Sequence, residues 1–274
     1  MQGRAKEAES RRSAKLRART LFLSDIHLGF KRARVRELAE FLRRVDAECI
    51  VLVGDIVDAL SLAKRFFWTD EHTEVLRLLL ARRRAGTRLV YVPGNHDAAL
   101  SIVADILHGS LEVHREWVHK TAGGARLLVA HGDQFEATLA CPGWLYKIAD
   151  VLYEANLALN HRVNDLRQLL GRPYKSLMER VKLALPASAR YIARFEQSAV
   201  RYAAEQGYDG VICGHIHRPR LCRIEGTLYA NTGDWVESCS ALVEDLRGEL
   251  QLYRWPCAGS GSECAQPALL ADAA

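Results

Sequence analysis

The stretch Leu21-Phe-Leu-Ser-Asp-Ile-His-Leu-Gly29 decides how the chain is organised. A short apolar run, Leu21 to Leu23, leads directly into a carboxylate and an imidazole two residues apart, Asp25 and His27. A buried strand gains nothing from ending on these polar side chains. A metal site does, because the end of a strand fixes a ligand on rigid backbone. One Asp-x-His pair carries little weight by itself, and four later repeats of the arrangement strengthen it.

Four further apolar runs end in a glycine-containing turn that carries Asp, Asn or His. They are 49–53 before Gly54-Asp55-Ile-Val-Asp58, 88–92 before Pro93-Gly94-Asn95-His96-Asp97, 126–130 before His131-Gly132-Asp133, and 210–213 before Gly214-His215-Ile216-His217. In an open sheet flanked by helices, ligand sites lie beyond the carboxyl ends of the strands. We therefore expect the five turns to meet at one edge, far apart in sequence and close in space.

Helical periods alternate with these runs, which favours an α/β fold with parallel strands joined by βαβ units. The spacing predicts helices over 34–45, 73–85 and 98–107, and short strands over 112–114 and 116–119. From 137 to 206 the pattern lacks a convincing strand and predicts helices over 145–170, 176–185 and 189–204. Antiparallel strands are expected in the last part, over 221–224, 227–230, 240–244 and 250–255.

Three regions follow from this organisation. A basic head at 1–19 and a small, polar tail at 256–274 are expected to be disordered, and a single domain spans 20–255. The helical insertion at about 137–206 is expected to cap the site and select the substrate. The plainer interpretation is a packing extension without substrate contact, since most apolar stripes belong to a core.

Composition limits the classes of protein to which the chain can belong. It has 274 residues, 49% of them hydrophobic, and a net charge of +5. This length suits one large domain or a domain with a big insertion. Residues 1–19 hold seven Lys or Arg against two Glu, typical of a solubilising tail or of a segment that contacts anionic lipid or nucleic acid. The head has no apolar core like that of a secretory signal. No apolar run approaches the roughly 18 residues that span a bilayer, so we expect a soluble or peripheral protein.

The cysteines are odd in number and form no C-x-x-C pair, which excludes a zinc ribbon. This pattern favours reduced thiols in a cytoplasmic protein over a disulfide framework. The seven are Cys49, Cys141, Cys213, Cys222, Cys239, Cys257 and Cys264.

The turns supply seven candidate metal ligands: Asp25, His27, Asp55, Asn95, His131, His215 and His217. Seven are too many for one zinc ion, which takes four, and they suit two cations. Mixed imidazole and carboxylate ligation fits Mn²⁺, Fe²⁺ or Zn²⁺. Two metals about 3.5–4 Å apart stabilise an in-line displacement at phosphorus. They need a shared ligand, and Asp55 is the natural bridge.

His96 follows Asn95, so its side chain is expected to point away from the ligand set. There it would meet a phosphoryl oxygen or protonate a leaving group, an effect worth roughly 10²–10⁴-fold in rate. Asp58, three residues after Asp55, is placed to orient His96. The histidines outside the pattern are interpreted as core or surface residues: His72, His108, His114, His119 and His161.

Taken in order, the five motifs resemble those of the calcineurin-like metallophosphoesterases, over about residues 20–255. The resemblance implies a four-layer α/β/β/α fold around two metal ions. It assigns Asp25, His27, Asp55 and His217 to one metal. It assigns Asp55, Asn95, His131 and His215 to the other.

The helical insertion and the stretch Asn231-Thr-Gly-Asp-Trp-Val-Glu237 resemble the UDP-2,3-diacylglucosamine diphosphatase group of lipid A synthesis. Those enzymes hydrolyse the pyrophosphate of a UDP-linked diacylated sugar at the cytoplasmic face of the inner membrane. An apolar helical cap suits acyl chains. The established members carry Arg where this chain has His96. The resemblance implies two divalent metal ions, most readily Mn²⁺, a phosphorylated lipid or nucleotide-sugar substrate, and a cytoplasmic protein peripheral to the membrane.

Three other functions stay open. A phosphatase or phosphodiesterase acting on another lipid or nucleotide would not need the acyl chains. A nuclease is slightly favoured by the basic head, but the sequence shows no basic groove interleaved with aromatic residues, and we expect no nucleic-acid partner. A metal-free scaffold would require lost ligands, and all seven are present.

Overall fold

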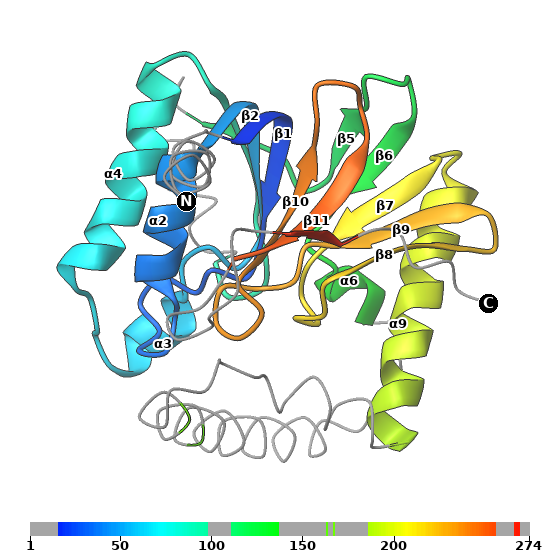
Figure 1. Ribbon diagram of the computed structural model, residues 1–274. Helices are drawn as coiled ribbons and strands as arrows, with labels where there is room; N and C mark the ends of the chain where they lie inside the picture. Colours follow the sequence, from blue (N-terminus) through cyan, green and yellow to red (C-terminus); the bar gives the residue numbers. More distant parts are fainter. Residues whose placement is uncertain are drawn as a thin grey trace, which may run out of the picture.

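Two β-sheets lie face to face at the centre of the fold (Figure 1). The computed structural model describes residues 16–97, 111–136, 163, 167, 186–255 and 266–268. The first sheet has the strand order β12-β11-β10-β1-β2-β3-β4. Its strands span Leu16–Leu23 (β1), Val45–Val53 (β2), Arg88–Val92 (β3), Glu112–Val113 (β4), Ser240–Glu244 (β10), Leu250–Arg254 (β11) and Gln266–Ala268 (β12).

The second sheet has the order β5-β6-β7-β9-β8. Its strands span Trp117–Lys120 (β5), Arg126–Val129 (β6), Gly210–Cys213 (β7), Arg220–Ile224 (β8) and Thr227–Asn231 (β9). The central strands of each sheet are parallel, β1 with β2 and β3 in the first and β6 with β7 and β9 in the second. The turns that follow them therefore leave each sheet at one edge.

Helices cover the outer face of each sheet and complete four layers. α2 (Val35–Arg44) and α4 (Asp70–Arg84) lie on the first sheet, and α9 (Pro186–Glu205) lies on the second (Figure 1). Along β1, Leu21 and Leu23 pack toward the helices while Phe22 packs between the sheets; Leu128 of β6 packs toward α9. Strands buried on both faces read as continuous apolar runs. The four-layer α/β/β/α fold class is thus confirmed.

Most predicted elements occur close to their expected positions. β7 and β10 have the expected bounds, and α9 begins three residues before the predicted 189–204. The sequence patterns do not mark two short helices, α3 (Ala59–Lys64) and α6 (Asp133–Glu136). α3 is too short to show a period. It forms because Asp58 caps it, accepting a hydrogen bond of 2.8 Å from the backbone N–H of Ser61.

Predictions for the two ends of the chain differ from the structure in part, and those for the insertion stay largely untested. Residues 16–19 do not belong to a disordered head, because β1 begins at Leu16 and pairs with β2 from Val45 onward. Residues 266–268 form β12 on β11, although the whole tail was expected to be disordered. The helices predicted over 98–107 and 176–185 lie outside the described residues. So does nearly all of 145–170, of which Val163 and Arg167 are helical.

Four cysteines lie in the described part of the chain, and all are free thiols: Cys49, Cys213, Cys222 and Cys239. Burial raises the pKa of Cys49 to about 11 and that of Cys213 to about 12. Both therefore stay protonated at neutral pH and are poor nucleophiles.

A buried polar cluster joins the two sheets near the middle of β1, away from the polar turns. Glu244 of β10 is fully buried. It accepts hydrogen bonds from Arg19 (2.7 Å), from Thr20 Oγ1 (3.0 Å), from Nε2 of His119 on β5 (2.7 Å) and from the backbone N–H of Ala122 (2.8 Å). Burial raises the pKa of Glu244, but the hydrogen bonds from His119 and Ala122 outweigh it and lower the pKa to about 2.

Glu244→Ala is expected to lower the free energy of unfolding at pH 7 by about 3–5 kcal/mol, because it leaves the side chains of His119 and Arg19 without the carboxylate that they contact. The wild-type carboxylate contributes fully above its unfolded pKa of about 4.5 and loses this contribution as the pH falls toward 2. Urea denaturation at pH 7 and pH 3 should show a smaller difference between the two proteins at pH 3. Glu249→Ala, at an exposed position nearby, is the control. Equal stabilities at pH 7 would contradict this account.

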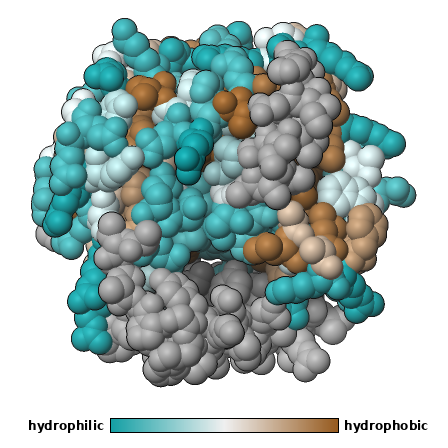
Figure 2. All heavy atoms as spheres, turned by 180° about the vertical axis from the view of Figure 1, so that it is seen from behind, coloured by the Kyte–Doolittle hydropathy of each residue, from teal (hydrophilic) through white to brown (hydrophobic). Residues whose placement is uncertain are grey.

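On the face opposite to the view of Figure 1, the described residues are largely hydrophilic, with apolar residues in separate areas among them (Figure 2). Within the described residues, no helix is both long enough and apolar enough to cross a membrane. The exposed large apolar side chains in this part of the chain are Leu60, Phe66, Leu80, Val118 and Leu246.

Candidate metal centre and active site

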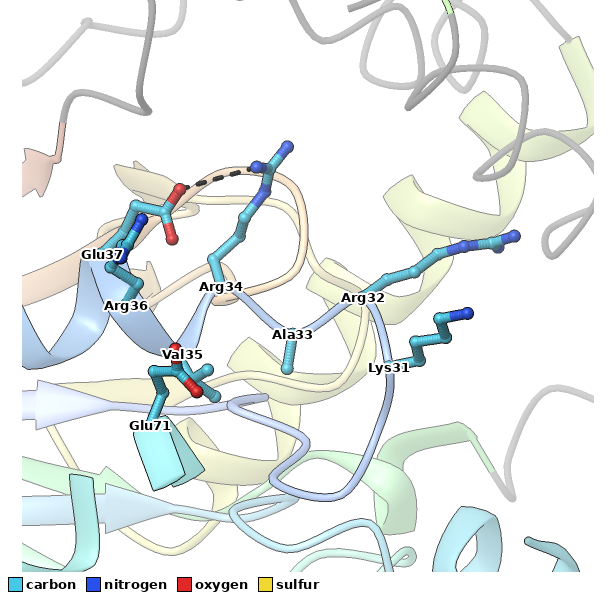
Figure 3. Close-up of a pocket in the computed structure, with 8 residues that line it drawn as sticks. All are labelled: Lys31, Arg32, Ala33, Arg34, Val35, Arg36, Glu37 and Glu71. Atoms are coloured by element: carbon cyan, nitrogen blue, oxygen red, sulfur yellow. Dashed lines mark ion pairs between the residues drawn. The ribbon is translucent and has the colours of Figure 1, made fainter. Parts of the chain in front are cut away.

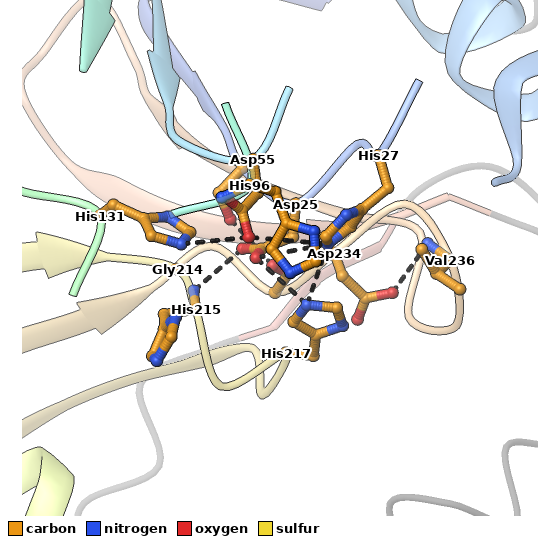
Figure 4. A network of polar contacts seen from close by, with 12 residues as sticks. Asp25, His27, Asp55, His96, His131, Gly214, His215, His217, Asp234 and Val236 are labelled. Carbon is orange, nitrogen blue, oxygen red and sulfur yellow. Dashed lines mark hydrogen bonds and ion pairs between the residues drawn. The ribbon is translucent and has the colours of Figure 1, made fainter. Parts of the chain in front are cut away.

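The polar turns of both sheets meet at one edge of the sandwich (Figure 4). Backbone hydrogen bonds extend beyond the strand ends and tie the turns together. The N–H of Asp25 donates to the carbonyl of Gly54 (3.0 Å), and the N–H of Gly214 donates to that of His131 (2.9 Å). Trp235, after β9, donates its N–H to the carbonyl of Asp25 (3.0 Å). Backbone hydrogen bonds therefore position the turns relative to one another without the help of side chains.

Five of the seven predicted ligands have a left-handed backbone. Their φ angles are 49° at Asp25, 51° at His27, 53° at Asp55, 67° at His215 and 52° at His217. Asp and His tolerate this conformation better than most residues, but it still costs of order 1–3 kcal/mol each. The surrounding hydrogen bonds stabilise this left-handed conformation. It makes the chain change direction sharply directly after each strand.

Two glycines let the backbone approach the carboxylates. A Cβ on Gly94 would lie 2.3 Å from Oδ1 of Asp55, and one on Gly214 would lie 2.3 Å from Oδ2 of Asp25. Because these glycines have no side chain, a backbone N–H can reach each carboxylate. The N–H of His96 donates to Oδ1 of Asp55 (2.9 Å), and the N–H of His215 donates to Oδ2 of Asp25 (3.0 Å). One oxygen of each carboxylate is thereby held by a backbone N–H. The other oxygen remains to bind a cation at the centre of the site.

Asp25, His27 and His217 form a first group of donor atoms that lie within 4.8 Å of one another. Oδ1 of Asp25 is 3.1 Å from Nε2 of His217, and the Nε2 atoms of His27 and His217 are 3.4 Å apart. Within the described structure, the buried Oδ1 of Asp25 has no well-aligned hydrogen bond. A divalent cation would satisfy these three donors together.

Asp25, Asp55 and His131 form a second group. Oδ2 of Asp55 lies 3.3 Å from Nε2 of His131 and 3.9 Å from Nε2 of His27. His131 donates its Nδ1–H to the carbonyl of Val53 (3.0 Å), which directs its buried Nε2 toward Asp55 as the atom that would bind a metal in place of a proton. Asp55 thus lies between two histidines predicted to hold different metals, the position that a bridging ligand needs.

The carboxylates concentrate negative charge in a buried space. Burial would raise the pKa of Asp25 and Asp55, but the neighbouring histidines hold the pKa of both below its usual range. Burial would lower the pKa of His131, but Asp55 raises that pKa to about 10. The cluster therefore stabilises buried positive charge. With the unsatisfied atoms of Asp25 and His131, this donor set fits divalent cations.

Two predicted ligands are not gathered into these groups. Asn95 is exposed. The ring of His215 stacks on Phe195 and donates its Nε2–H to Oε2 of Glu136 (3.0 Å), and it points away from the centre (Figure 4). Of the ligands assigned to the second metal, the structure therefore brings together Asp55 and His131. Glu136, at the end of α6, is a polar neighbour of the site that no sequence motif marks.

The predicted pairing of His96 with Asp58 is confirmed, and the roles of both stay predictions. Nδ1 of His96 donates to Oδ1 of Asp58 (3.0 Å), and Nδ1 of His27 lies 3.4 Å from Oδ2. Burial raises the pKa of Asp58, but hydrogen bonds from His27 and His96 outweigh it and hold that pKa well below its usual range. One carboxylate thus orients a predicted metal ligand and the predicted acid. His96 also forms a third group of donor atoms with His27 and Asp55, and its ring lies 4.9 Å from that of His27. The expectation that its side chain points away from the ligand set is therefore wrong, because the hydrogen bond to Asp58 holds the ring beside His27.

This geometry agrees with the comparison to known families. A model of the family described as calcineurin-like phosphoesterase matches residues 18–219, about three-quarters of the chain. The chain belongs to the calcineurin-like phosphoesterases. It is a metal-dependent phosphohydrolase, and its His and Asp clusters are consistent with the binuclear metal site. No curated protein matches the sequence of this calcineurin-like phosphoesterase.

Several solved structures are similar to this calcineurin-like phosphoesterase at low sequence identity. A single-mutant Vps29 from Entamoeba histolytica has 13% identity and a TM-score of 0.48, covering 91% of this chain and 97% of that one. A novel archaeal phosphodiesterase has 13% identity and a TM-score of 0.45, covering 85% and 97%. YfcE, a phosphoesterase from E. coli, has 16% identity and a TM-score of 0.43, covering 86% and 91%.

Proposed function

We propose that this enzyme hydrolyses a phosphoester or pyrophosphate bond, using two divalent metal ions, most readily Mn²⁺, and His96 as the acid. The observation that carries the proposal is the pair of buried donor groups with the hydrogen bond between His96 and Asp58 beside them. Asp25, His27 and His217 would hold one ion and Asp55 and His131 the other. Bound divalent cations would supply Lewis-acid charge and lower the pKa of water.

The residues of the chain itself define the rest of the chemistry. Because Asp58 accepts the Nδ1–H of His96, the Nε2 atom of His96 remains for the substrate. The side chain of His96 is 30% exposed, so a ligand can reach it. From Nε2, His96 would donate a proton to the leaving oxygen or a hydrogen bond to a phosphoryl oxygen. His215 would join the ligands only after leaving Glu136.

The substrate that we propose first is UDP-2,3-diacylglucosamine, which would place the enzyme at the cytoplasmic face of a membrane. The motif resemblance and the helical insertion that the sequence predicts support this choice. The stretch from Asn231 to Glu237 supports it less, because in this fold it has a structural role. Thr232 donates its N–H to the carbonyl of Cys213 (2.9 Å), and Trp235 bonds to Asp25 in the same way. The stretch therefore positions the metal turns.

Turnover with Mn²⁺ of UDP-2,3-diacylglucosamine and of the deacylated UDP-sugar tests the proposal. We expect UMP release from the acylated substrate alone, because the acyl chains would supply the binding energy that orients the pyrophosphate. Protein treated with EDTA is the control and should be inactive. Hydrolysis of bis(p-nitrophenyl) phosphate without either UDP-sugar would keep the metal chemistry and reject the lipid A substrate. Failure on all three would contradict the proposed function.

A phosphatase or phosphodiesterase acting on another lipid or nucleotide is the second candidate. His96 favours it, since the established diacylglucosamine enzymes carry Arg at this position. A shorter imidazole reaches less far than a guanidinium and contacts one phosphoryl oxygen where Arg contacts two. Equal turnover of acylated and deacylated UDP-sugars would favour this candidate.

A further inference from the structure

A short segment beside the site combines exposed apolar side chains with cations. Phe66 is 77% exposed and Leu60 is 50% exposed. Between them in the sequence, Lys64 and Arg65 are exposed as well. Scattered single apolar residues on a surface are normal, whereas a cluster commonly marks an interaction site.

A second feature is a cationic hollow lined by residues 31–37 and by Glu71 (Figure 3). Its volume is about 380 Å³. Arg34 forms an ion pair with Glu37 (3.5 Å), and the chains of Lys31 and Arg32 extend outward from the loop (Figure 3). Its charged lining residues are four cations and two carboxylates, namely Lys31, Arg32, Arg34, Arg36, Glu37 and Glu71. Positive charge therefore predominates there.

The segment and the hollow pack against each other. A Cβ on Gly29 would lie 2.6 Å from Cγ of Leu62, so α3 lies directly on the loop that leads into the hollow. Glu71, which lines the hollow, precedes His72, and the ring of His72 contacts that of Phe67 at a centroid distance of 5.6 Å. The segment and the hollow are therefore neighbours in the fold.

Hydrogen bonds fix this surface relative to the metal centre. Oδ1 of Asp58 accepts from the backbone N–H of Ser61 in α3 (2.8 Å) and from His96 (3.0 Å). At the hollow, the backbone N–H of Arg34 donates to the carbonyl of Trp235 (2.7 Å), and the backbone N–H of Trp235 donates to the carbonyl of Asp25 (3.0 Å). A molecule bound to the segment at 60–66 and to the hollow would therefore lie next to the metal centre.

We propose that residues 60–66, with the hollow at 31–36, form a surface that binds an anionic lipid bilayer. Phe66 and Leu60 enter the boundary between headgroups and acyl chains, and the cations contact lipid phosphates. Apolar side chains flanked by Lys and Arg are typical of such interfacial anchors. A free phosphate would engage the cations and leave Phe66 in water. The proposal deepens the proposed function, because it would deliver a lipid substrate, but binding is measured without turnover.

Flotation of the full chain with vesicles tests this surface. Vesicles of phosphatidylcholine with phosphatidylglycerol are compared with vesicles of phosphatidylcholine alone. The variants are Leu60→Ser with Phe66→Ser, and Lys64→Glu with Arg65→Glu. Leu246→Ser is the matched control: Leu246 is 50% exposed like Leu60, but it follows β10 at the end of the sheet remote from the site. Circular dichroism and thermal unfolding confirm that each variant is folded, and hydrolysis of bis(p-nitrophenyl) phosphate is measured alongside.

The wild type and Leu246→Ser are expected to bind the anionic vesicles equally. The apolar variant should bind about tenfold or more weakly, since burying one large apolar side chain is worth at least that factor. The charge variant should lose the preference for phosphatidylglycerol. Wild-type binding by both variants would overturn the proposal and point to residues 1–15, and so would equal loss in Leu246→Ser. Failure of the diester assay with retained vesicle binding would count against the proposed function alone.

Discussion

Asp55→Ala is expected to lower kcat by about 10³-fold or more and to reduce the metal content of the protein. The side chain lies 3.3 Å from His131 and 3.9 Å from His27, so its loss weakens both proposed ion sites. Losing several kcal/mol of charge stabilisation at the reacting phosphoryl group corresponds to that loss of rate. Elemental analysis after loading with Mn²⁺, together with hydrolysis of bis(p-nitrophenyl) phosphate, measures both effects.

Asp46→Ala is the matched control, because Asp46 is also on the strand that leads to Asp55. Its carboxylate lies 3.4 Å from Arg82 and its side chain is 54% exposed, so this pair contributes little. Unchanged rate and metal content are expected in this variant. An Asp55→Ala protein that retained two metals would show that Asp55 is not the bridge. Asp25, which belongs to two of the donor groups, would then be the candidate.

His96→Ala is expected to retain both metals and to lose about 10²–10⁴-fold in kcat. Metal is retained because the contact of residue 96 with Asp55 is made by its backbone N–H, which the substitution preserves. If His96 protonates the leaving group, the loss should be larger for an alkyl ester than for a p-nitrophenyl ester, whose leaving group needs little protonation. Rates with a series of leaving groups, measured alongside metal content, separate these contributions.

His114→Ala is the control, since its side chain is 42% exposed and lies outside the motifs. A rate loss that is equal for all leaving groups would assign His96 to phosphoryl binding. Loss of metal in His96→Ala would make His96 a ligand, as the third donor group with His27 and Asp55 would allow. Unchanged turnover would remove it from the chemistry.

The fold class could be predicted from the sequence because its strands are buried on both faces. Each strand of a two-sheet sandwich with outer helices packs against a sheet on one side and a helix on the other, so it reads as a continuous apolar run. The runs at 21–23 and 210–213 show this, and the polar residues that follow them mark where burial ends. Local pattern was sufficient for the elements and for the set of candidate ligands.

Pairing partners distant in sequence decided the limits of these elements. β1 begins at Leu16, in a segment that reads as a basic head, because Leu16–Leu23 pairs along β2. Arg19 is accommodated there because Glu244, 225 residues away, accepts its hydrogen bonds. α3 begins where the side chain of Asp58 caps its N-terminus. A local pattern cannot reveal such contacts, since each depends on a partner that only the fold brings near.

By itself the sequence determined which residue types follow each strand, and hence the family and the chemistry that these donors support. Only the tertiary structure decided where the side chains point. It groups Asp25 with His27 and His217, turns His215 toward Glu136, and leaves Asn95 exposed. The physical reason is that orientation depends on φ angles and on contacts across the two sheets. Neither is encoded in the spacing of residues along one turn.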